Sequence, residues 1–490
     1  MTGSHDATRS ATDLTLIVLA AGGGTRMRSR LPKPFHPVAG RPMVEHVIRA
    51  GRAAHPDRVV AVVSDRTADL AARVAGESGL RTVLQREALG TGDAVRQVFD
   101  AADILPDAGL ILVLYCDHPL LDSETVSRLA AGAAGNDAAV TLLTCILPEA
   151  GAYGRVVRDR HGRATGIIER ADDDPALRAG PTEVWSGMMA LDVAWTRNAI
   201  RLLTPSPVTG ELYLTELIEM AVESAGTAGT WPVQVVQAPP EIAHGINDRV
   251  QLAEAEAILR DRIRRRWMLA GVTMDDPATV YIDDDVTIGP DTVILPASHL
   301  RAGTTVGRDC VIGPAADLAG ATVGNGVTIR ASTVTHATIH DGADVGPYSH
   351  LRQGTVVGAG VHVGNFGEFK NAHLAAGVKV GHFGYLGDVT VGANTNIGAG
   401  TVVANFDGQR KHATTIGANV FIGSDTVLRA PVTVGDDAAT GAGSVVIRDV
   451  PAGTTVAGVP ARPIPRRSDS GPDPAAASGP DQSDPSKPER

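Results

Sequence analysis

The first half of the chain alternates short aliphatic runs with longer stretches in which apolar and polar residues mix. The aliphatic runs predict strands at Leu16–Ala20, Val59–Val63, Leu110–Leu114 and Ala139–Leu143. Helical patterns lie between them, for example at Pro42–Ala54 and Ser123–Ala133. Strands that alternate with helices predict βαβ units, so we expect an α/β domain over residues 14–246, with helices on both faces of a mostly parallel sheet.

One long helix is predicted next. Apolar residues recur at spacings of three and four between Asn247 and Leu269, with charges between them. Asn247 is the expected N-cap, and Pro277 closes the segment. We therefore expect residues 247–279 to form a helical arm that connects two domains.

From about Val280 the apolar positions recur every six residues. Series of this kind, joined by one-residue slips, include Ile288, Ile294, Leu300, Val306, Ile312 and Leu318, and later Ile339, Val345, Leu351, Val357 and Val363. A glycine follows the aliphatic residue in many units. Hexapeptide repeats predict a left-handed parallel β-helix over residues 280–465, with about nine or ten coils. The aliphatic side chain points inward, and we expect the small residue to let the chain turn each corner.

Three further segments depart from these patterns. The polar excursion at residues 405–413 interrupts the hexads, and insertions in solenoids form loops that are often on the binding face. Residues 1–13 are a polar tail. Residues 466–490 are rich in Ser, Pro, Asp and Gly, so we expect them to be disordered.

Composition narrows the range of functions. Aromatic residues are 3% of the chain while glycine numbers 55, so the core must be built from small and branched side chains. The net charge of −11 argues against a nucleic-acid partner, and three cysteines are too few for a disulfide framework or a metal cluster. No membrane-length apolar run or signal-peptide layout is seen, so we expect a cytoplasmic protein without a membrane partner.

Candidate chemistry begins directly after the first predicted strand. The loop Leu19–Met27 contains three consecutive glycines, whose N–H groups can cradle phosphate. Arg26 and Lys33 add positive charge that phosphate requires. The alternative interpretation is a glycine-rich turn with solvated charges.

The joint pattern Gly-Gly-Gly-Thr-Arg-Met followed by Pro-Lys-Pro resembles the sugar-phosphate nucleotidyltransferase family, whose domain is Rossmann-like. The resemblance implies catalytic roles for Arg26 and Lys33. It implies nucleotide contacts at Leu19, Ala20, Gly22, Lys33, Gln85, Gly90 and Thr91. It implies sugar-phosphate contacts at Gly154, Glu169, Trp185 and Asn247. Asp117 and Asn247 are the implied Mg²⁺ ligands, because Mg²⁺ prefers oxygen; the alternatives are a strand-end cap for Asp117 and a helix cap for Asn247.

The order of the two domains resembles one family closely: the bifunctional N-acetylglucosamine-1-phosphate uridyltransferase and glucosamine-1-phosphate acetyltransferase. The resemblance spans about Leu14 to Val459. It implies UTP and acetyl-CoA as co-substrates and a homotrimer whose acetyl-transfer sites are shared between chains. His382 is the implied general base, because a histidine can take the proton of the attacking amine. Implied sugar-phosphate contacts are Arg352, Lys370, Tyr385 and Asn396. Implied contacts of the acetyl-CoA site are Asn405, Phe406, Lys411, Ser424 and Ala442, with Lys411 also a candidate for the sugar phosphate.

The sequence departs from the family pattern mainly in the first domain. Trp185 stands where the family has a sugar-binding Asn, Ala171 replaces a Lys, and Cys116 and His118 flank Asp117. The expected activity is acetylation of glucosamine-1-phosphate followed by uridylyl transfer, which makes UDP-N-acetylglucosamine for cell-wall polymers. Two alternatives stay open: a divergent relative that acts on another amino or deoxy sugar-1-phosphate or has a weakened nucleotidyltransferase half, and a trimeric scaffold without catalysis.

Overall fold

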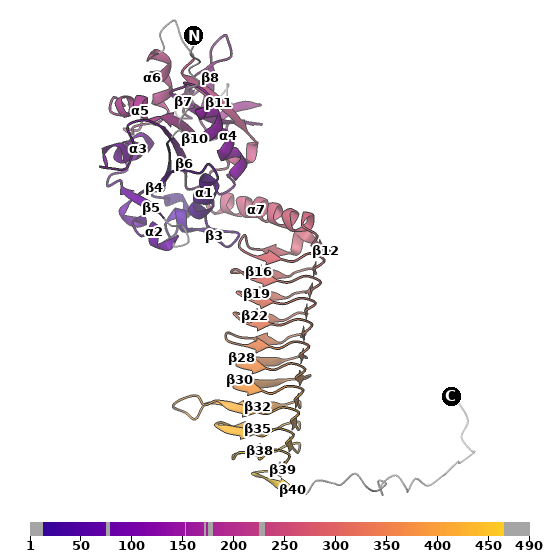
Figure 1. Ribbon diagram of the computed structural model, residues 1–490. Helices are drawn as coiled ribbons and strands as arrows, with labels where there is room; N and C mark the ends of the chain where they lie inside the picture. Colours follow the sequence, from indigo (N-terminus) through magenta and orange to yellow (C-terminus); the bar gives the residue numbers. More distant parts are fainter. Residues whose placement is uncertain are drawn as a thin grey trace, which may run out of the picture. The chain divides into compact units, whose positions relative to one another are not determined.

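The computed structural model describes residues 13–74, 79–151, 153–170, 173–174, 180–224 and 231–464 (Figure 1). The chain divides into two compact units. Residues up to Arg266, together with Ile282–Asp285, form the first unit, and Trp267–Tyr281 with the residues from Val286 onward form the second. The expected tails at residues 1–13 and 466–490 lie, apart from Asp13, outside the described residues.

The first unit is built on one sheet with the strand order β11-β7-β10-β6-β1-β4-β5. The strands are β1 (Leu14–Leu19), β4 (Arg58–Val63), β5 (Leu80–Leu84), β6 (Leu110–Tyr115), β7 (Val140–Leu147), β10 (Thr182–Asp192) and β11 (Val233–Ala238). β1 is parallel to β4 and β6, β5 is parallel to β4, and β11 is parallel to β7. The mostly parallel sheet is confirmed; the antiparallel strands are β10 and the two strands β8 (Arg155–Arg158) and β9 (Ala164–Ile168) that pair at its side.

β10 runs antiparallel to both β6 and β7. It follows the antiparallel hairpin of β8 and β9 rather than a crossover helix, and a parallel strand needs such a crossover. Its pairing with β7 is irregular between Trp185 and Met189. A short separate ribbon pairs β2 (Pro37–Val38) with β3 (Arg41–Pro42).

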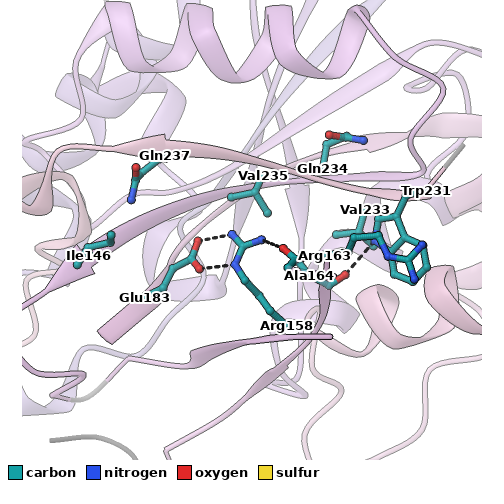
Figure 2. A pocket seen from close by; sticks show the side chains of 11 residues that line it. Ile146, Arg158, Arg163, Ala164, Glu183, Trp231, Val233, Gln234, Val235 and Gln237 are labelled. Atoms are coloured by element: carbon teal, nitrogen blue, oxygen red, sulfur yellow. Dashed lines mark hydrogen bonds and ion pairs between the residues drawn. The ribbon is translucent and has the colours of Figure 1, made fainter. Parts of the chain in front are cut away.

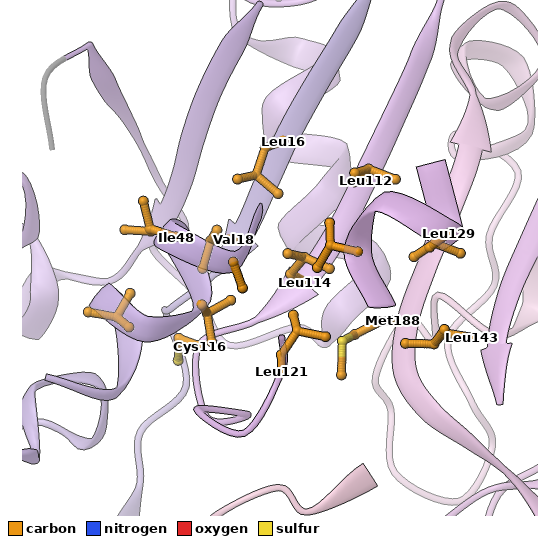
Figure 3. Close-up of a cluster of buried hydrophobic side chains, with 14 of the residues drawn as sticks. Leu16, Val18, Ile48, Leu112, Leu114, Cys116, Leu121, Leu129, Leu143 and Met188 are labelled. Atoms are coloured by element: carbon orange, nitrogen blue, oxygen red, sulfur yellow. The ribbon is translucent and has the colours of Figure 1, made fainter. Parts of the chain in front are cut away.

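Helices cover both faces of the sheet. Successive side chains of a strand point to opposite faces, so each strand contributes to a hydrophobic core on either side of the sheet. Leu16 and Val18 of β1 belong to a cluster with the inward faces of α1 and α4 (Figure 3), while Ile17 and Leu19 belong to a second cluster with α3, α5 and α6. The helices of this unit are α1 (Met43–Arg52), α2 (Leu70–Arg73), α3 (Thr91–Asp100), α4 (Ser123–Ala134), α5 (Val193–Ala199) and α6 (Glu216–Ser224). Aliphatic side chains dominate both cores, as the composition required.

The long helix is α7 (Arg249–Leu269). Ala255 of α7 is buried in a cluster with Met27 and Ile246 of the first unit. The predicted cap at Asn247 is wrong: Asp248 Oδ1 accepts the N–H groups of Val250 and Gln251, both at 2.9 Å. Asn247 and Asp248 are both residue types that cap helices well. Only Asp248 directly precedes the first turn of α7, so its side chain reaches the free N–H groups of that turn.

The second unit is a parallel β-helix of very short strands. One sheet has the order β12 (Thr273–Met274), β15 (Val293–Ile294), β18 (Val311–Ile312), β21 (Thr328–Ile329), β24 (Asp344–Val345), β27 (His362–Val363), β29 (Lys379–Val380), β31 (Asn396–Ile397), β34 (Phe421–Ile422), β37 (Ala439–Thr440), β39 (Thr455–Gly458) and β40 (Ala461–Ile464).

The second, larger sheet of the β-helix folds around two sides of each coil. Its strands are β13 (Tyr281–Ile282), β14 (Thr287–Ile288), β16 (His299–Arg301), β17 (Thr305–Val306), β19 (Asp317–Ala319), β20 (Thr322–Val323), β22 (Thr333–Thr335), β23 (Thr338–Ile339), β25 (His350–Leu351), β26 (Val356–Val357), β28 (Gly367–Leu374), β30 (Gly384–Val391), β32 (Thr401–Ala404), β33 (Thr414–Ile416), β35 (Val427–Arg429), β36 (Val432–Val434) and β38 (Val445–Val446).

The hexad aliphatics point inward and stack on their counterparts in the next coil. Ile294 pairs with Ile312 and Ile312 with Ile329, and all three side chains are fully buried. The predicted left-handed β-helix of hexapeptide repeats is therefore confirmed. The expected reason for the glycines needs correction at Gly364, whose backbone is not left-handed. A Cβ there would lie 1.9 Å from the Gly381 oxygen, so the glycine is required by the close approach of adjacent coils.

Within the described parts of the chain, no helix combines the length and the apolar character that crossing a membrane requires.

Candidate functional site

The glycine loop of the first unit leaves β1 and leads to a 3₁₀ turn at Thr25–Met27. A Cβ at Gly22 or Gly23 would meet nothing within 4 Å, so a ligand can approach this backbone closely. Gly24 has a left-handed backbone with φ of 59°, and a Cβ there would lie 2.6 Å from the Cβ of Lys33. Glycine at this position therefore lets Lys33 pack directly against the loop.

Lys33 joins three segments that are far apart in the sequence. Its ammonium donates to the Asp117 carboxylate and, at 3.2 Å, to Asn247 Oδ1. Arg26 donates to the same Asn247 oxygen at 2.8 Å. The structure thus brings together the side chains of Arg26, Lys33, Asp117 and Asn247. The Asp117 side chain is engaged in this ion pair rather than in capping a strand.

The ionisation of Asp117 is set by its neighbours. Burial raises its pKa, but the Lys33 ammonium and the His118 ring, whose Nδ1 lies 2.9 Å from Asp117 Oδ1, outweigh burial and hold the pKa well below its usual range. The carboxylate is therefore ionised at neutral pH. An ionised carboxylate and an amide oxygen that converge on one cation have the chemistry of a Mg²⁺ ligand pair.

The donor set fits Mg²⁺ as a partner shared with substrate. Among the residues that the structure describes, no group of three or more His, Cys, Asp and Glu side chains could hold a metal ion. Mg²⁺ is commonly held by one or two carboxylates, with substrate phosphates and waters as its other ligands. Asp117 and Asn247 supply the protein oxygens for such an arrangement.

A pocket of about 290 Å³ lies beside the glycine loop. Its lining includes most of the residues predicted to contact the nucleotide, namely Leu19, Gly22, Lys33, Gln85, Gly90 and Thr91, together with Asp117. Ala20 is not in the lining: its side chain is fully buried in the core, and its N–H donates to Val62.

Gln85 is oriented by its amide nitrogen. Nε2 donates to the Gly90 carbonyl oxygen at 3.1 Å and to Asp93 Oδ2 at 2.9 Å. Since both N–H groups point into the protein, the carbonyl oxygen Oε1 is the atom that can face a ligand. A donor such as the N3–H group of a uracil ring is the matching partner.

A second pocket, of about 550 Å³, adjoins the same ion pair. Its lining includes Arg26, Asp117 and Asn247 with the predicted sugar contacts Gly154, Glu169 and Trp185. The Trp185 side chain is buried, and its indole N–H donates to the Met188 carbonyl at 3.0 Å. Its ring therefore presents only apolar surface. Ala171, which replaces a family Lys, lies outside the described residues.

Sequence reasoning missed Tyr115. It is the last residue of β6 and lines both pockets, with its ring 6.1 Å from those of Trp185 and His118 in edge-on contacts. Burial raises the pKa of its hydroxyl. The position of Tyr115 at the carboxyl end of a parallel strand could have identified it from the sequence, because α/β sheets bind ligands at this end of their strands.

Three cations of the second unit interact: Lys370 lies on β28, Arg352 directly follows β25, and Lys411 lies in the inserted loop. Arg352 Nη1 lies 2.6 Å from Glu368, whose strand carries Lys370 two residues later. The adjacent Lys411 lowers the pKa of Lys370, and Arg352 adds to this effect. A like charge disfavours the charged form of its neighbour, and a bound anion would offset that effect; the phosphate site stays a prediction.

The inserted loop holds Lys411 in place through its own hydrogen bonds. The N–H of His412 donates to the Asn405 carbonyl at 2.8 Å, and Phe406 and Lys411 form an antiparallel bridge. The carboxylate of Asp407 accepts the N–H groups of Gln409 and Arg410. The loop is therefore braced as a short hairpin that returns to the β-helix.

The other predicted acetyl-transfer residues lie elsewhere on the coil. His382, Ser424 and Ala442 each follow a strand of the smaller sheet by two residues, so they occupy the same corner of the β-helix; the coil of β31 lies between the coil of His382 and that of Ser424. Asn396 lies on that smaller sheet, between Lys379 and Phe421. Among the residues that the structure describes, the His382 side chain has no hydrogen bond or ion pair.

A further pocket, of about 470 Å³, lies over β11 and the β8–β9 hairpin and contains none of the predicted residues (Figure 2). Arg158 makes a two-point contact with Glu183, at 2.7 Å for each bond. Arg163 pairs with Asp159, and its guanidinium lies 3.8 Å from the centre of the Trp231 ring. Both arginines of this pocket are therefore paired with carboxylates of the same unit.

Comparison with known proteins agrees with this geometry. Residues 16–151 match the MobA-like NTP transferase domain, and residues 413–448 match the six-repeat bacterial transferase hexapeptide family. The chain is 42% identical over 437 residues to the bifunctional protein GlmU of Trichlorobacter lovleyi, covering 89% of this chain and 93% of the relative. It is 42% identical to the GlmU of Kineococcus radiotolerans and 41% to that of Streptomyces avermitilis, covering about 90% of each chain.

Proposed function

The chain belongs to the bifunctional GlmU family, and from that premise we propose that it makes UDP-N-acetylglucosamine in two steps. The β-helix unit transfers an acetyl group from acetyl-CoA to glucosamine-1-phosphate. The first unit then transfers uridylyl from UTP to the product and releases pyrophosphate. The observation that carries the proposal is the Lys33 ammonium, which is held between Asp117 and Asn247 beside an open glycine loop.

In the uridylyl step, a phosphate oxygen of the sugar phosphate attacks the α-phosphorus of UTP. The new P–O bond forms as the bond to the β-phosphate breaks. Lys33 and Arg26 offset the charge that gathers on the phosphates, which is the main demand of phosphoryl chemistry. Gln85 Oε1 accepts the uracil N3–H. Mg²⁺ held by Asp117 and Asn247 would neutralise phosphate charge when bound.

In the acetyl step, the amine of glucosamine-1-phosphate attacks the thioester carbonyl carbon, and the CoA thiolate leaves. His382 takes the proton that the amine loses. Arg352, Lys370 and Lys411 hold the sugar phosphate, and Ser424 donates to the developing oxyanion. The clustering of these three cations supports the phosphate assignment.

We also propose a homotrimer in the cytoplasm, in which a neighbouring chain completes each acetyl-transfer site. The match of residues 413–448 to the bacterial transferase hexapeptide family supports an oligomer. A second support is the exposed aromatic pair on the β-helix, Tyr348 and Phe366, whose rings stack at 5.5 Å while the residues are 63% and 59% exposed. Exposed apolar patches of this kind mark interaction surfaces.

One observation favours a second candidate for the nucleotidyltransferase step. Trp185 uses its N–H on the protein backbone, and the neighbouring Ser186 hydroxyl donates to the Leu143 carbonyl. This wall of the sugar pocket offers no side-chain donor from these two residues. The second candidate is therefore a sugar-1-phosphate with an apolar or deoxygenated edge, acted on by the same chemistry.

The proposal is tested by assaying each half-reaction on the purified protein. Glucosamine-1-phosphate with acetyl-CoA should release free CoA thiol, and N-acetylglucosamine-1-phosphate with UTP and Mg²⁺ should release pyrophosphate. Absence of both products would reject the bifunctional enzyme and favour a scaffold. Thiol release without pyrophosphate would favour the second candidate for the first unit.

A further inference from the structure

Three polar residues form a column at one corner of the β-helix, one coil apart. Asn371 Nδ2 donates to Asp388 Oδ1 at 2.9 Å, and Asn405 Nδ2 donates to Asp388 Oδ2 at 2.6 Å. Each pair is separated by 17 residues. Asp388 therefore stands at the centre of the column and uses one carboxylate oxygen on each neighbour.

The carboxylate determines the orientation of the Asn405 amide. An ionised carboxylate only accepts hydrogen bonds, so the Asn405 atom that faces it must be the NH₂ group. The other N–H of this group points to the Tyr385 hydroxyl oxygen at 3.4 Å. The carbonyl oxygen Oδ1 is then turned away from the column. Asn405 is only 6% exposed, but among the described residues Oδ1 has no hydrogen-bond partner and is not one of the fully buried polar atoms, so it is the free acceptor of this side chain.

Gly387 makes this arrangement possible. A Cβ at Gly387 would lie 2.3 Å from the Tyr385 hydroxyl oxygen and 2.7 Å from Asn405 Nδ2. Any side chain there would push the two groups apart. Gly387 also pairs in register with Lys370 of the preceding coil, which places the contact beside the cation cluster.

We propose that Asp388 is a positioning residue for acetyl transfer. By fixing the NH₂ group of Asn405, it leaves Oδ1 to accept an N–H of the substrate amine, which orients the nitrogen lone pair toward the thioester. The Tyr385 oxygen accepts from Asn405, so its own O–H remains to donate to the sugar phosphate. This inference rests on the proposed acetyltransferase function and names a residue that the sequence comparison had not singled out.

The test compares Asp388→Asn with Asn371→Gly in steady-state acetyl transfer from acetyl-CoA to glucosamine-1-phosphate. Asp388→Asn keeps the size of the side chain and tolerates the backbone φ of 51°, but one of its two acceptor atoms becomes a donor. We expect kcat to fall by about 10- to 100-fold, while KM for both substrates changes by less than about threefold. Asn371→Gly removes the other bond of the column at a backbone φ of 49°, which glycine accepts, and should leave kcat within about twofold of the wild type.

Gly387→Ala provides a second variant with unchanged charge, and it should lower kcat as Asp388→Asn does. Because the three substitutions lie in the β-helix unit, denaturant unfolding followed by circular dichroism reports that this unit is folded in each variant. Wild-type kcat in Asp388→Asn, or equal losses in Asp388→Asn and Asn371→Gly, would overturn the inference, because a purely structural column would respond to either break. If Asp388→Asn fails to fold, a wild-type kcat in Gly387→Ala overturns the inference alone. A wild-type protein that releases no CoA thiol would instead refute the proposed acetyltransferase.

Discussion

At the residue scale, we expect Trp185 to influence which sugar phosphate the first site accepts. Its N–H is used on the Met188 carbonyl, and its ring forms an apolar wall with Tyr115. A smaller polar residue there would open space and add hydrogen-bonding groups. We therefore expect Trp185→Asn to raise kcat/KM for N-acetylglucosamine-1-phosphate by about tenfold or more, measured by pyrophosphate release.

The same variant should act in the opposite direction on 6-deoxy or other less hydroxylated sugar-1-phosphates, because these gain from an apolar wall. Acetyl transfer by the β-helix unit serves as the control and should not change. If the wild type uses N-acetylglucosamine-1-phosphate efficiently and Trp185→Asn changes little, the idea of an altered sugar pocket is wrong.

Single-residue roles could be predicted where a motif resembles a known family and the residue type suits the chemistry. The resemblance to the nucleotidyltransferase family pointed to Lys33, Arg26, Asp117 and Asn247, and the structure brings all four together. The N-cap could not be chosen, since Asn247 and Asp248 are both good capping residues and only the backbone geometry separates them. The role of Asp388 depends on which residues face each other one coil apart, and the slips in the hexads obscure that register.

At the element scale, the glycines of the β-helix are constrained by the distance between adjacent coils. A Cβ at Gly364 would overlap the Gly381 oxygen, whereas a Cβ at Gly381, the next position of the same column, would meet the His362 ring at an ordinary 3.8 Å. We expect Gly364→Ala to lower the free energy of unfolding by about 1–3 kcal/mol. Denaturant unfolding followed by circular dichroism measures this change.

Gly381→Ala is the matched control and should leave stability unchanged or slightly raised, because alanine restricts the unfolded chain more than glycine does. Equal losses in the two variants would show that the close approach of coils is not the reason for glycine in this column.

The positions of strands along the chain were easier to predict from the sequence than the directions in which the strands run. Each short strand of the β-helix is fixed by its local six-residue period, so its position could be read directly from the sequence. The antiparallel direction of β10 depends on the hairpin of β8 and β9, whose pairing with the sheet is a tertiary contact that the periodicity does not encode. The domain boundaries and the role of α7 as a connecting arm stay predictions.

At the scale of the whole molecule, two sites of different chemistry belong to two compact units of one chain. The site of the first unit centres on Lys33, and the proposed base of the second unit is His382. Because each site has its own residues, loss of one activity should leave the other intact. Variants in each unit therefore show which unit performs each step.

The most direct measurement follows product formation from glucosamine-1-phosphate, acetyl-CoA, UTP and Mg²⁺ by mass spectrometry. The wild type should form UDP-N-acetylglucosamine with one CoA thiol and one pyrophosphate per product. Lys33→Ala should slow pyrophosphate release by about 100-fold or more and accumulate N-acetylglucosamine-1-phosphate, and His382→Ala should release neither product from this mixture. A wild type that forms no nucleotide sugar, or a Lys33→Ala variant that forms it at the wild-type rate, would contradict the account.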